Sequence, residues 1–79
     1  AIRIFPNPSS GNFTITFPDI TNNGSIEIYS VLGERIFSEP VSLTSKKEIN
    51  LNNISCGIYF VKVYDGEKYF CKKIIVEQN

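Results

Sequence analysis

Hydrophobic residues alternate with polar ones along most of this chain, and that period of two constrains its fold more than any other feature. Phe13, Ile15 and Phe17, for example, alternate with Thr14 and Thr16. Side chains of a strand point alternately to its two faces, so each such run predicts a strand with one face on a core. No stretch keeps the helical period over the roughly dozen residues that a stable helix needs. The predicted strands lie at residues 2–5, 13–17, 26–29, 35–37, 41–43, 49–51, 58–64 and 69–76.

Residues that favour turns separate these runs at short intervals. They lie at 6–11, 18–19 with 22–24, 32–34, 39–40, 45–47, 52–57 and 65–66. Proline, glycine, asparagine and serine recur in these segments because each suits a turn for its own stereochemical reason. The sequence therefore predicts an all-β fold, a single Ig-like antiparallel β-sandwich of about seven short strands with Greek-key connections.

Length and composition indicate one globular domain, residues 1–79, with a thin core. Apolar residues make up 42% of the chain, which is too high for a disordered tail. The chain opens directly on a strand-like run, Ile2–Phe5, without a signal peptide. We therefore expect it to be a domain excised from a larger secreted protein.

Charge and hydropathy argue against nucleic-acid binding and against insertion into a membrane. Eight Lys and Arg residues balance eight Asp and Glu residues, giving a formal net charge of +0. Such a chain lacks the long-range positive field that nucleic-acid binding usually needs. Its longest apolar runs, such as Ile74–Val76, are far too short to span a bilayer, so we expect no membrane insertion.

Cys56 and Cys71 are the two cysteines, and hairpin geometry predicts that they stay unbonded. Asp65-Gly66 is a strong signal for a two-residue hairpin loop. Such a loop pairs Phe60 with Cys71 and places Cys56 opposite Ile75. The cysteines would then lie about 13 Å apart along the ladder, whereas a disulfide needs Cα atoms within about 7 Å. Two thiols without any histidine also make a metal site unexpected.

The chain also lacks the side chains on which most enzymes depend. It contains no histidine, the usual general base near neutral pH. Its serines lie in predicted turns without the G-x-S-x-G setting of a nucleophile, and its acidic residues are scattered. Its glycines mark turns rather than helix starts, which argues against a phosphate-binding loop. We therefore expect no catalytic residue, no cofactor and no metal.

Aromatic side chains on the predicted strands leave one alternative open. Most of them are expected in core or cross-strand packing. Several on one exposed face would instead form a sugar-binding platform, and alternation along the sequence does not decide between these two arrangements. The residues concerned are Tyr29, Tyr59, Phe60, Tyr64, Tyr69 and Phe70.

Lysine side chains are expected to protect the sheet edges. An unprotected edge strand exposes unpaired backbone groups that another chain can pair with, and charged side chains discourage such pairing. The candidate edge guards are Lys46-Lys47, Lys62, Lys68 and Lys72-Lys73.

Four short motifs, spread in order along the chain, resemble those of a known family. They are Ile4 to Gly11, Ile28 to Arg35, Ser55 to Val63, and Lys73 to Val76. Over essentially its whole length the chain resembles the type A C-terminal sorting domain of the type IX (Por) secretion system. That family has an aromatic residue before P-N-P and a glycine, then D-x-x-G before a basic residue, then G-x-Y, then K-x-x-V. In this chain, serine stands at the Asp position of the second motif, and a glutamate separates its glycine from the basic residue.

Most of the motif residues also have a predicted structural role. Pro6 and Pro8 fix φ near about −65° and lack an N–H donor, so the first strand should end there. Glycine permits positive φ in the turns that follow. Tyr59 is expected to pack its ring inward and to hydrogen-bond through its hydroxyl. Lys73 is the exception, because no fold requires a lysine there. The candidate sorting residues are Pro6, Asn7, Pro8, Gly11, Gly33, Gly57, Tyr59, Lys73 and Val76.

The resemblance implies a function in addressing rather than in catalysis. In this family the sorting domain follows an N-terminal cargo domain, and the protein passes through the periplasm in transit. The type IX secretion translocon of the outer membrane recognises the domain, and a sortase-like peptidase commonly removes it. The cargo is then secreted or attached at the cell surface. The resemblance places the address largely in the residues after Lys72. The alternative is a fibronectin-like spacer or a carbohydrate-binding module of a secreted hydrolase.

Overall fold

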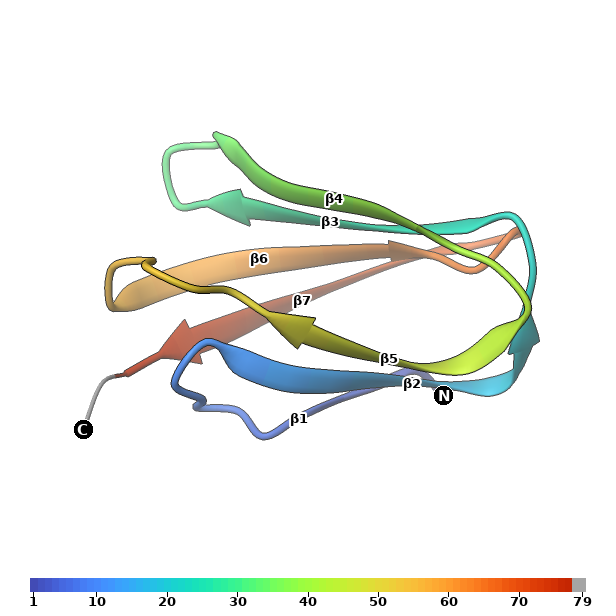
Figure 1. Cartoon of the computed structure of the whole chain (residues 1–79). Coiled ribbons are helices and arrows are strands. Elements are labelled where there is room, and N and C mark those ends of the chain that lie inside the picture. The colour runs from blue at the N-terminus through green and yellow to red at the C-terminus, as the bar shows by residue number, and fades with distance from the viewer. Residues whose placement is uncertain (78–79) are drawn as a thin grey trace.

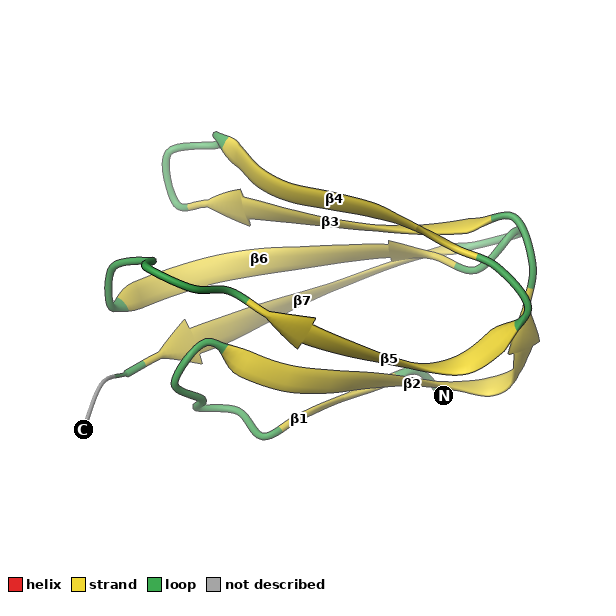
Figure 2. Cartoon of the chain, in the orientation of Figure 1, coloured by secondary structure: helices red, strands yellow, loops and turns green. Residues whose placement is uncertain are grey.

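Two antiparallel sheets pack face to face in the computed structural model, which describes residues 1–77 (Figure 1). One sheet has the strand order β1–β2–β5, and the other has the order β4–β3–β6–β7. Figure 2 shows only strands and loops among the described residues. The predicted all-β sandwich of seven strands is therefore confirmed. The strands are β1 (Arg3–Phe5), β2 (Asn12–Thr21), β3 (Gly24–Ser30), β4 (Arg35–Val41), β5 (Thr44–Asn50), β6 (Gly57–Tyr64) and β7 (Tyr69–Val76).

The connections between strands follow a Greek-key pattern. β2 pairs with β5 although β3 and β4 lie between them in the sequence, and β3 pairs with β6 across β4 and β5. The chain passes from one sheet to the other after β2, after β4 and after β5. Local hairpins join β3 to β4 and β6 to β7. This arrangement agrees with the Ig-like topology that the sequence predicts.

The core consists of the inward-facing residues of both sheets. On β2 the buried apolar residues are Phe13, Ile15 and Phe17, which are the apolar members of the alternating run. On β6 they are Tyr59, Val61 and Val63. Alternation along the sequence thus becomes alternation between core and solvent. The remaining buried apolar residues are Ile4, Ile26, Ile28, Val41, Ile49, Leu51, Ile74 and Val76.

The β6–β7 hairpin has a four-residue loop, so the predicted two-residue loop is wrong. Tyr64 pairs with Tyr69. The Asp65 carboxylate accepts the backbone N–H groups of Lys68 and Glu67, both at 2.8 Å, and the Asp65 N–H donates to the Lys68 carbonyl at 3.1 Å. These bonds stabilise the longer loop, and they lower the pKa of Asp65, chiefly through Lys68 and then Glu67. The register shifts by two residues, so every side chain keeps its predicted face.

The two cysteines lie farther apart than the predicted register implied. Cys71 pairs with Lys62 rather than with Phe60, and Cys56 precedes β6 instead of facing Ile75. Six residues therefore separate Cys56 from the ladder partner of Cys71, about 20 Å along a strand. Both thiols are free, as predicted, and both are exposed.

Three predicted turns are strand segments instead. Pro18-Asp19 lies in β2, Glu39-Pro40 in β4 and Ser45–Lys47 in β5. Pro40 is compatible with its position because β4 is an edge strand, where a missing N–H is tolerated. The connection between β4 and β5 is instead a tight turn that includes Leu43, with φ of 55°. Leu43 therefore does not extend a strand as the alternation predicted.

The chain connections gather at two opposite poles of the sandwich (Figure 1). We call one end the distal pole, made of residues 6–11, 31–34 and 51–56 with the end of β7. The other end, the proximal pole, contains Ala1 and the turns after β2, β4 and β6. Figure 1 shows the N-terminus and the end of β7 at these opposite ends.

Candidate functional site

All nine predicted sorting residues lie at the distal pole or on the strand ends that lead into it. They come from four segments that are far apart in the sequence, yet backbone pairing and hydrogen bonds connect the segments directly. The fold thus assembles the four motifs into one region. The residues are Pro6, Asn7, Pro8, Gly11, Gly33, Gly57, Tyr59, Lys73 and Val76.

The first motif holds the last strand along its edge. The Asn7 side chain donates from Nδ2 to the Lys73 carbonyl at 3.2 Å, and its Oδ1 accepts the Ile75 N–H at 2.9 Å. The Ser9 N–H donates to the Ile75 carbonyl at 3.0 Å, and the Glu77 N–H donates to the Ser9 carbonyl at 2.8 Å. The segment from Asn7 to Ser9 therefore acts as a short additional partner of β7. We call this set of four bonds the Asn7–Ser9 clamp.

The clamp occupies one half of the free edge of β7. In an antiparallel ladder, successive residues direct their backbone groups alternately toward and away from the partner strand. The clamp bonds involve Lys73, Ile75 and Glu77, whose groups face away from β6. Ser9 also forms a parallel bridge with Val76. The final part of β7 is consequently paired on both sides.

We expect Asn7→Ala to loosen the final strand selectively. The substitution removes two hydrogen bonds, and their loss should lower the free energy of unfolding by about 1–2 kcal/mol. The Ile75 amide would lose its acceptor, so its hydrogen exchange should accelerate more than exchange in β2 or β3. Asn12→Ala, at an exposed position of β2, is the matched control. Equal protection of the Ile75 amide in both variants would contradict this role for Asn7.

Gly11 packs against the loop that precedes β6. Its φ is +112°, which strongly favours glycine, and its carbonyl accepts the Leu51 N–H at 2.9 Å. A Cβ atom at this position would lie 2.7 Å from the Leu51 carbonyl oxygen. The glycine of the first motif thus permits a close approach between two loops of the distal pole.

Ser30 supports the β3–β4 turn although the related family has aspartate at this position. The Gly33 N–H donates to the Ser30 carbonyl at 2.9 Å, and φ of Gly33 is +90°. The Ser30 hydroxyl oxygen accepts the Glu34 N–H at 3.2 Å, and the Ser30 N–H donates to the Glu34 carbonyl at 2.8 Å. A serine oxygen thereby performs the turn-capping task that suits an aspartate carboxylate.

The third and fourth motifs pair with each other on β6 and β7. Gly57 lies opposite Val76, which is 1% exposed, and Tyr59 lies opposite Ile74. The Tyr59 ring is buried, and its hydroxyl donates to the Ser55 carbonyl at 2.6 Å. This bond anchors the β5–β6 loop to the sheet in the manner of a tyrosine corner. The inward packing predicted for Tyr59 is confirmed.

Lys73 differs from the other motif residues because its side chain is exposed. It lies on the outer face of the four-stranded sheet, opposite Phe60 on β6. Its ammonium forms no ion pair within residues 1–77. The ion pairs among these residues therefore assign the Lys73 ammonium no structural role.

Each of the four edge strands carries its own protection against pairing with another chain. β1 has only three residues, β4 contains Pro40, and the clamp covers the end of β7. Lys47 of β5 forms an ion pair with Glu39 of β4, which links two edges of opposite sheets. Lys72 has the parity of inward-facing residues yet is exposed, and an inward charge is a known edge defence. Lys46-Lys47 and Lys72-Lys73 therefore lie on edge strands as predicted.

Two of the six predicted edge guards do not lie on an edge strand. Lys62 projects from the outer face of the central strand β6. Lys68 lies in the β6–β7 loop. The sequence pattern could not locate Lys62 correctly because strand order, rather than alternation, decides which strands are edges.

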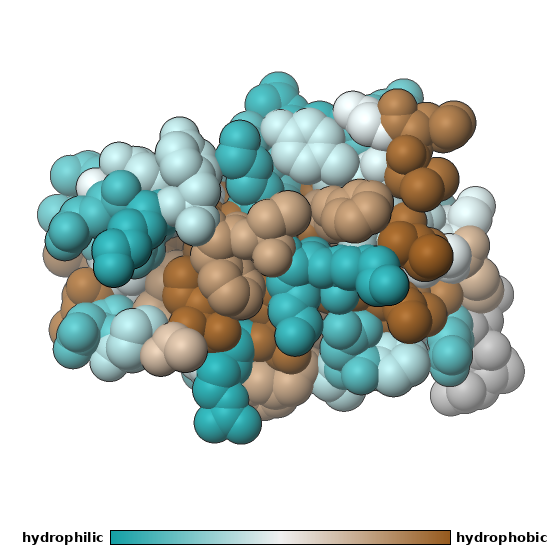
Figure 3. All heavy atoms as spheres, turned by 180° about the vertical axis from the view of Figure 1, so that it is seen from behind, coloured by the Kyte–Doolittle hydropathy of each residue, from teal (hydrophilic) through white to brown (hydrophobic). Residues whose placement is uncertain are grey.

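Exposed apolar residues on the outer face of the four-stranded sheet were missed by the sequence analysis. Ile58 and Ile75 form a cross-strand pair there, with 42% and 37% of their surface exposed. Val31 and Leu32 follow directly after Ser30, whose partner on β6 is the neighbour of Ile58. Figure 3 shows apolar side chains gathered along this end of the molecule. The sequence signal for this surface was Leu32, an apolar residue within a predicted turn.

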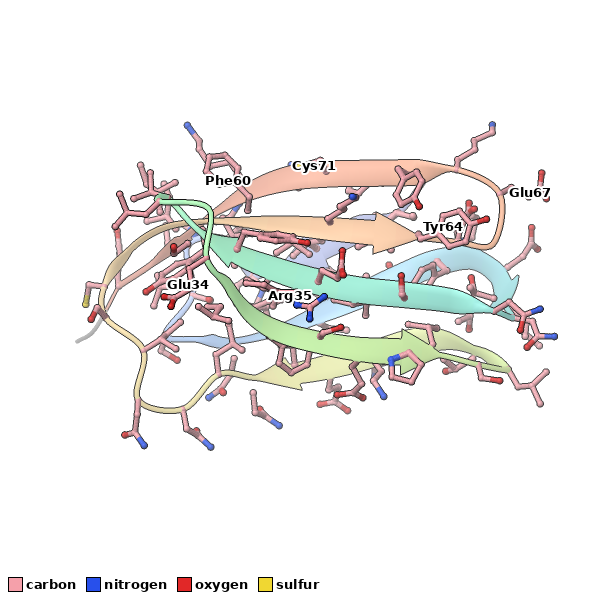
Figure 4. All side chains as sticks on the ribbon, turned by 90° about the horizontal axis from the view of Figure 1, so that it is seen from above. Glu34, Arg35, Phe60, Tyr64, Glu67 and Cys71 are labelled. Carbon is pink, nitrogen blue, oxygen red and sulfur yellow. The ribbon has the colours of Figure 1, made fainter. Side chains whose placement is uncertain are left out.

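The aromatic residues divide between the core and the outer face. Tyr59 is buried and Phe70 packs against the core. The other four occupy strand positions that face outward from the four-stranded sheet: Tyr29, Phe60, Tyr64 and Tyr69. Figure 4 shows Phe60 toward the distal pole and Tyr64 near the β6–β7 turn.

The most exposed aromatic ring is already engaged by its neighbours. Tyr69 contacts the Tyr64 ring, with centroids 4.7 Å apart, and the Lys62 ammonium lies 4.7 Å from its centroid. A sugar ring would need a free aromatic face, so these contacts argue against a sugar-binding platform at this position.

A shallow pocket of about 280 Å³ lies at the proximal pole, with mostly apolar lining that includes Ile2, Pro18 and Phe70. Among residues 1–77, no group of three or more His, Cys, Asp or Glu side chains is placed to hold a metal ion. The same residues form no helix that is long and apolar enough to cross a membrane.

Comparison with known proteins provides two findings. A family model described as a secretion system C-terminal sorting domain matches residues 3–77. The chain is also 36% identical, over 78 residues, to an endo-acting ulvan lyase of Formosa agariphila. That alignment covers 96% of this chain but only 15% of the lyase. The chain thus spans a small fraction of the length of the relative that it matches.

Proposed function

This chain belongs to the family of secretion system C-terminal sorting domains, and from that membership we propose that its distal pole is the address read by the type IX translocon. The domain acts as a type IX sorting signal and is itself non-catalytic. The observation that carries the proposal is the convergence of all four motifs at one end of the sandwich.

The position of this pole supports a role in recognition. Residues 1–79 would form the sorting unit on the C-terminal side of a cargo domain. Because the cargo domain would precede Ala1, it would attach at the proximal pole. The distal pole would remain accessible whatever the cargo is, because it lies at the opposite end of the molecule (Figure 1). A polysaccharide lyase would be one suitable kind of cargo, since the related lyase from Formosa agariphila contains a similar segment.

In this proposal some motif residues shape the distal pole and others contact the translocon. Gly11, Gly33, Tyr59 and Val76 are constrained by backbone conformation or burial, so they shape the pole. Lys73 is exposed and makes no ion pair among the described residues, so it contacts the translocon directly. The predicted address extended from Lys73 to the chain end, and residues 78–79 of it lie outside the described residues.

The proposal also includes the route and fate of the protein. A secreted or cell-surface protein is indicated by the family, and passage through the periplasm precedes recognition at the outer membrane. After export, a sortase-like peptidase removes the domain by cutting upstream of the sandwich and attaches the cargo at the surface. The cut would fall in the connection between cargo and domain, since the first strand begins at Arg3.

We expect Lys73→Ala to retain a reporter in the periplasm. The test fuses the domain to the C-terminus of a reporter with an N-terminal export signal, in cells that possess the type IX system. The wild-type fusion should reach the medium or the cell surface. Lys73→Ala should lower the exported fraction of the reporter about tenfold, the effect of losing one charge contact that is buried in the complex. Lys62→Ala is the matched control, because Lys62 lies on the same face of a central strand.

Two outcomes would contradict parts of this proposal. Export of the reporter without any sorting domain would show that the domain is not the signal. Equal export of the Lys73→Ala and Lys62→Ala fusions would remove Lys73 from the address. A spacer or carbohydrate-binding module, by contrast, predicts that the wild-type fusion stays in the periplasm.

A further inference from the structure

Four exposed aliphatic residues at the distal pole lie within the sorting motifs but are not among the nine candidate sorting residues. We call Val31, Leu32, Ile58 and Ile75 the distal patch. Leu32 is 93% exposed and Val31 is 66% exposed, in a turn that the Ser30–Glu34 hydrogen bonds hold in place. Ile58 and Ile75 lie side by side on β6 and β7. Exposed aliphatic clusters of this kind usually mark an interaction surface.

The sheet edges of this domain are poor sites for a partner to bind. β-strand addition needs an open edge, and the edges here are short, interrupted by proline, charged or covered by the clamp. A partner that recognises this domain must therefore rely mainly on side chains. Among the described residues, the distal patch offers exposed aliphatic side chains that lie within the sorting motifs.

The charge next to the patch indicates the chemistry of the partner. Lys73 lies two residues before Ile75 on the same face of β7, because residues two apart on a strand share a face. Its ammonium has no ion-pair partner among residues 1–77. Phe60 lies between Lys73 and Tyr29 on the outer face and extends the apolar surface inward from the pole. The complementary surface would be aliphatic or aromatic, with an acidic group placed against Lys73.

We propose that the distal patch docks onto an apolar surface of the secretion machinery, which presents an acidic side chain to Lys73. This inference rests on the proposed sorting function and adds the surface through which it operates. The location favours the machinery as the occupant, since cargo attached before Ala1 would lie at the other pole (Figures 1 and 3). The motif residues then serve to hold Leu32, Ile58 and Ile75 in one surface.

The test uses the full-length cargo protein in cells that possess the secretion system. The patch variant combines Leu32→Ser with Ile58→Thr and Ile75→Thr, because threonine keeps the β-branched shape suited to strands. We expect its exported fraction to fall about tenfold or more, as removal of central apolar contacts typically does. The matched control combines Leu43→Ser with Ile20→Thr, two exposed aliphatic positions at the proximal pole, and should be exported like the wild type.

Folding and self-association are measured on the same purified variants. Leu32→Ser should leave the melting temperature nearly unchanged, whereas Ile58→Thr and Ile75→Thr should lower it by several degrees, because more than half of each isoleucine is covered. A single Leu32→Ser variant, in a turn at 93% exposure, keeps the test valid if the triple variant is destabilised. Wild-type export of both variants would overturn the patch while leaving the sorting function intact. A patch-dependent dimer in solution, with export unchanged, would assign the surface to a second copy and overturn the proposal as well.

Discussion

Gly11→Ala should remove a large share of the stability of this domain. Its φ of +112° costs an L-residue about 1–3 kcal/mol. The new Cβ would also lie 2.7 Å from the Leu51 carbonyl oxygen, so the two loops must separate and weaken the Leu51 N–H···O bond to Gly11. With about 1 kcal/mol for that bond, we expect a total loss near 3 kcal/mol. Denaturant unfolding of the purified domain measures it directly.

Gly33→Ala is the control that separates the two causes. Gly33 also has positive φ, at +90°, but a Cβ atom there would meet nothing within 4 Å. It should therefore cost only the backbone strain, about 1–2 kcal/mol. Equal losses in the two variants would show that the contact between Gly11 and Leu51 contributes nothing.

Tyr59→Ala should be the most damaging single truncation among the motif residues. The side chain is 8% exposed and packs within the core cluster, so its removal leaves a cavity beneath the distal pole. Loss of a buried aromatic ring typically costs about 3–5 kcal/mol. For a domain of this size such a loss approaches the whole stability, so thermal unfolding of the variant should begin near room temperature.

Tyr59→Phe isolates the contribution of the hydroxyl. This variant keeps the ring and loses the bond to the Ser55 carbonyl, which should cost about 1–2 kcal/mol. Amide exchange in the β5–β6 loop should accelerate, while exchange in β2 remains slow. A Phe variant as unstable as the Ala variant would mean that the hydroxyl bond, rather than ring packing, supports the pole.

The sequence was sufficient to predict the architecture because strand faces depend on alternation alone. Ile15, Ile26 and Val61 are buried as their parity predicts, and the fold is the expected sandwich. A shift of two residues along a strand leaves each side chain on the same face of the sheet. The predicted β6–β7 register was therefore wrong, although the predicted face of each residue on these two strands was right. The hydrogen bonds of the Asp65 side chain were not predicted, and they stabilise a four-residue loop in place of the two-residue one.

The relation among the motifs was harder to predict than their individual roles. Glycine conformation and Tyr59 burial follow from local chemistry and were predicted. The bond between Asn7 and Lys73 was not, because it joins residues 66 apart through a pairing that no local pattern encodes. For the same reason, the neighbourhood of Leu32 and Ile58 became visible only once strand order was known.

The Asn7–Ser9 clamp determines when, during synthesis of the chain, the distal pole can be completed. Its bonds join residues 66 and 68 positions apart, so the distal pole is incomplete until the final strand is available. A polypeptide whose synthesis stopped before β7 would lack Ile74 and Val76 from the core as well as the edge that Asn7 holds. Translation through β7 is therefore needed to complete the distal pole, and a chain that ended before this strand would lack the surface that we propose as the address.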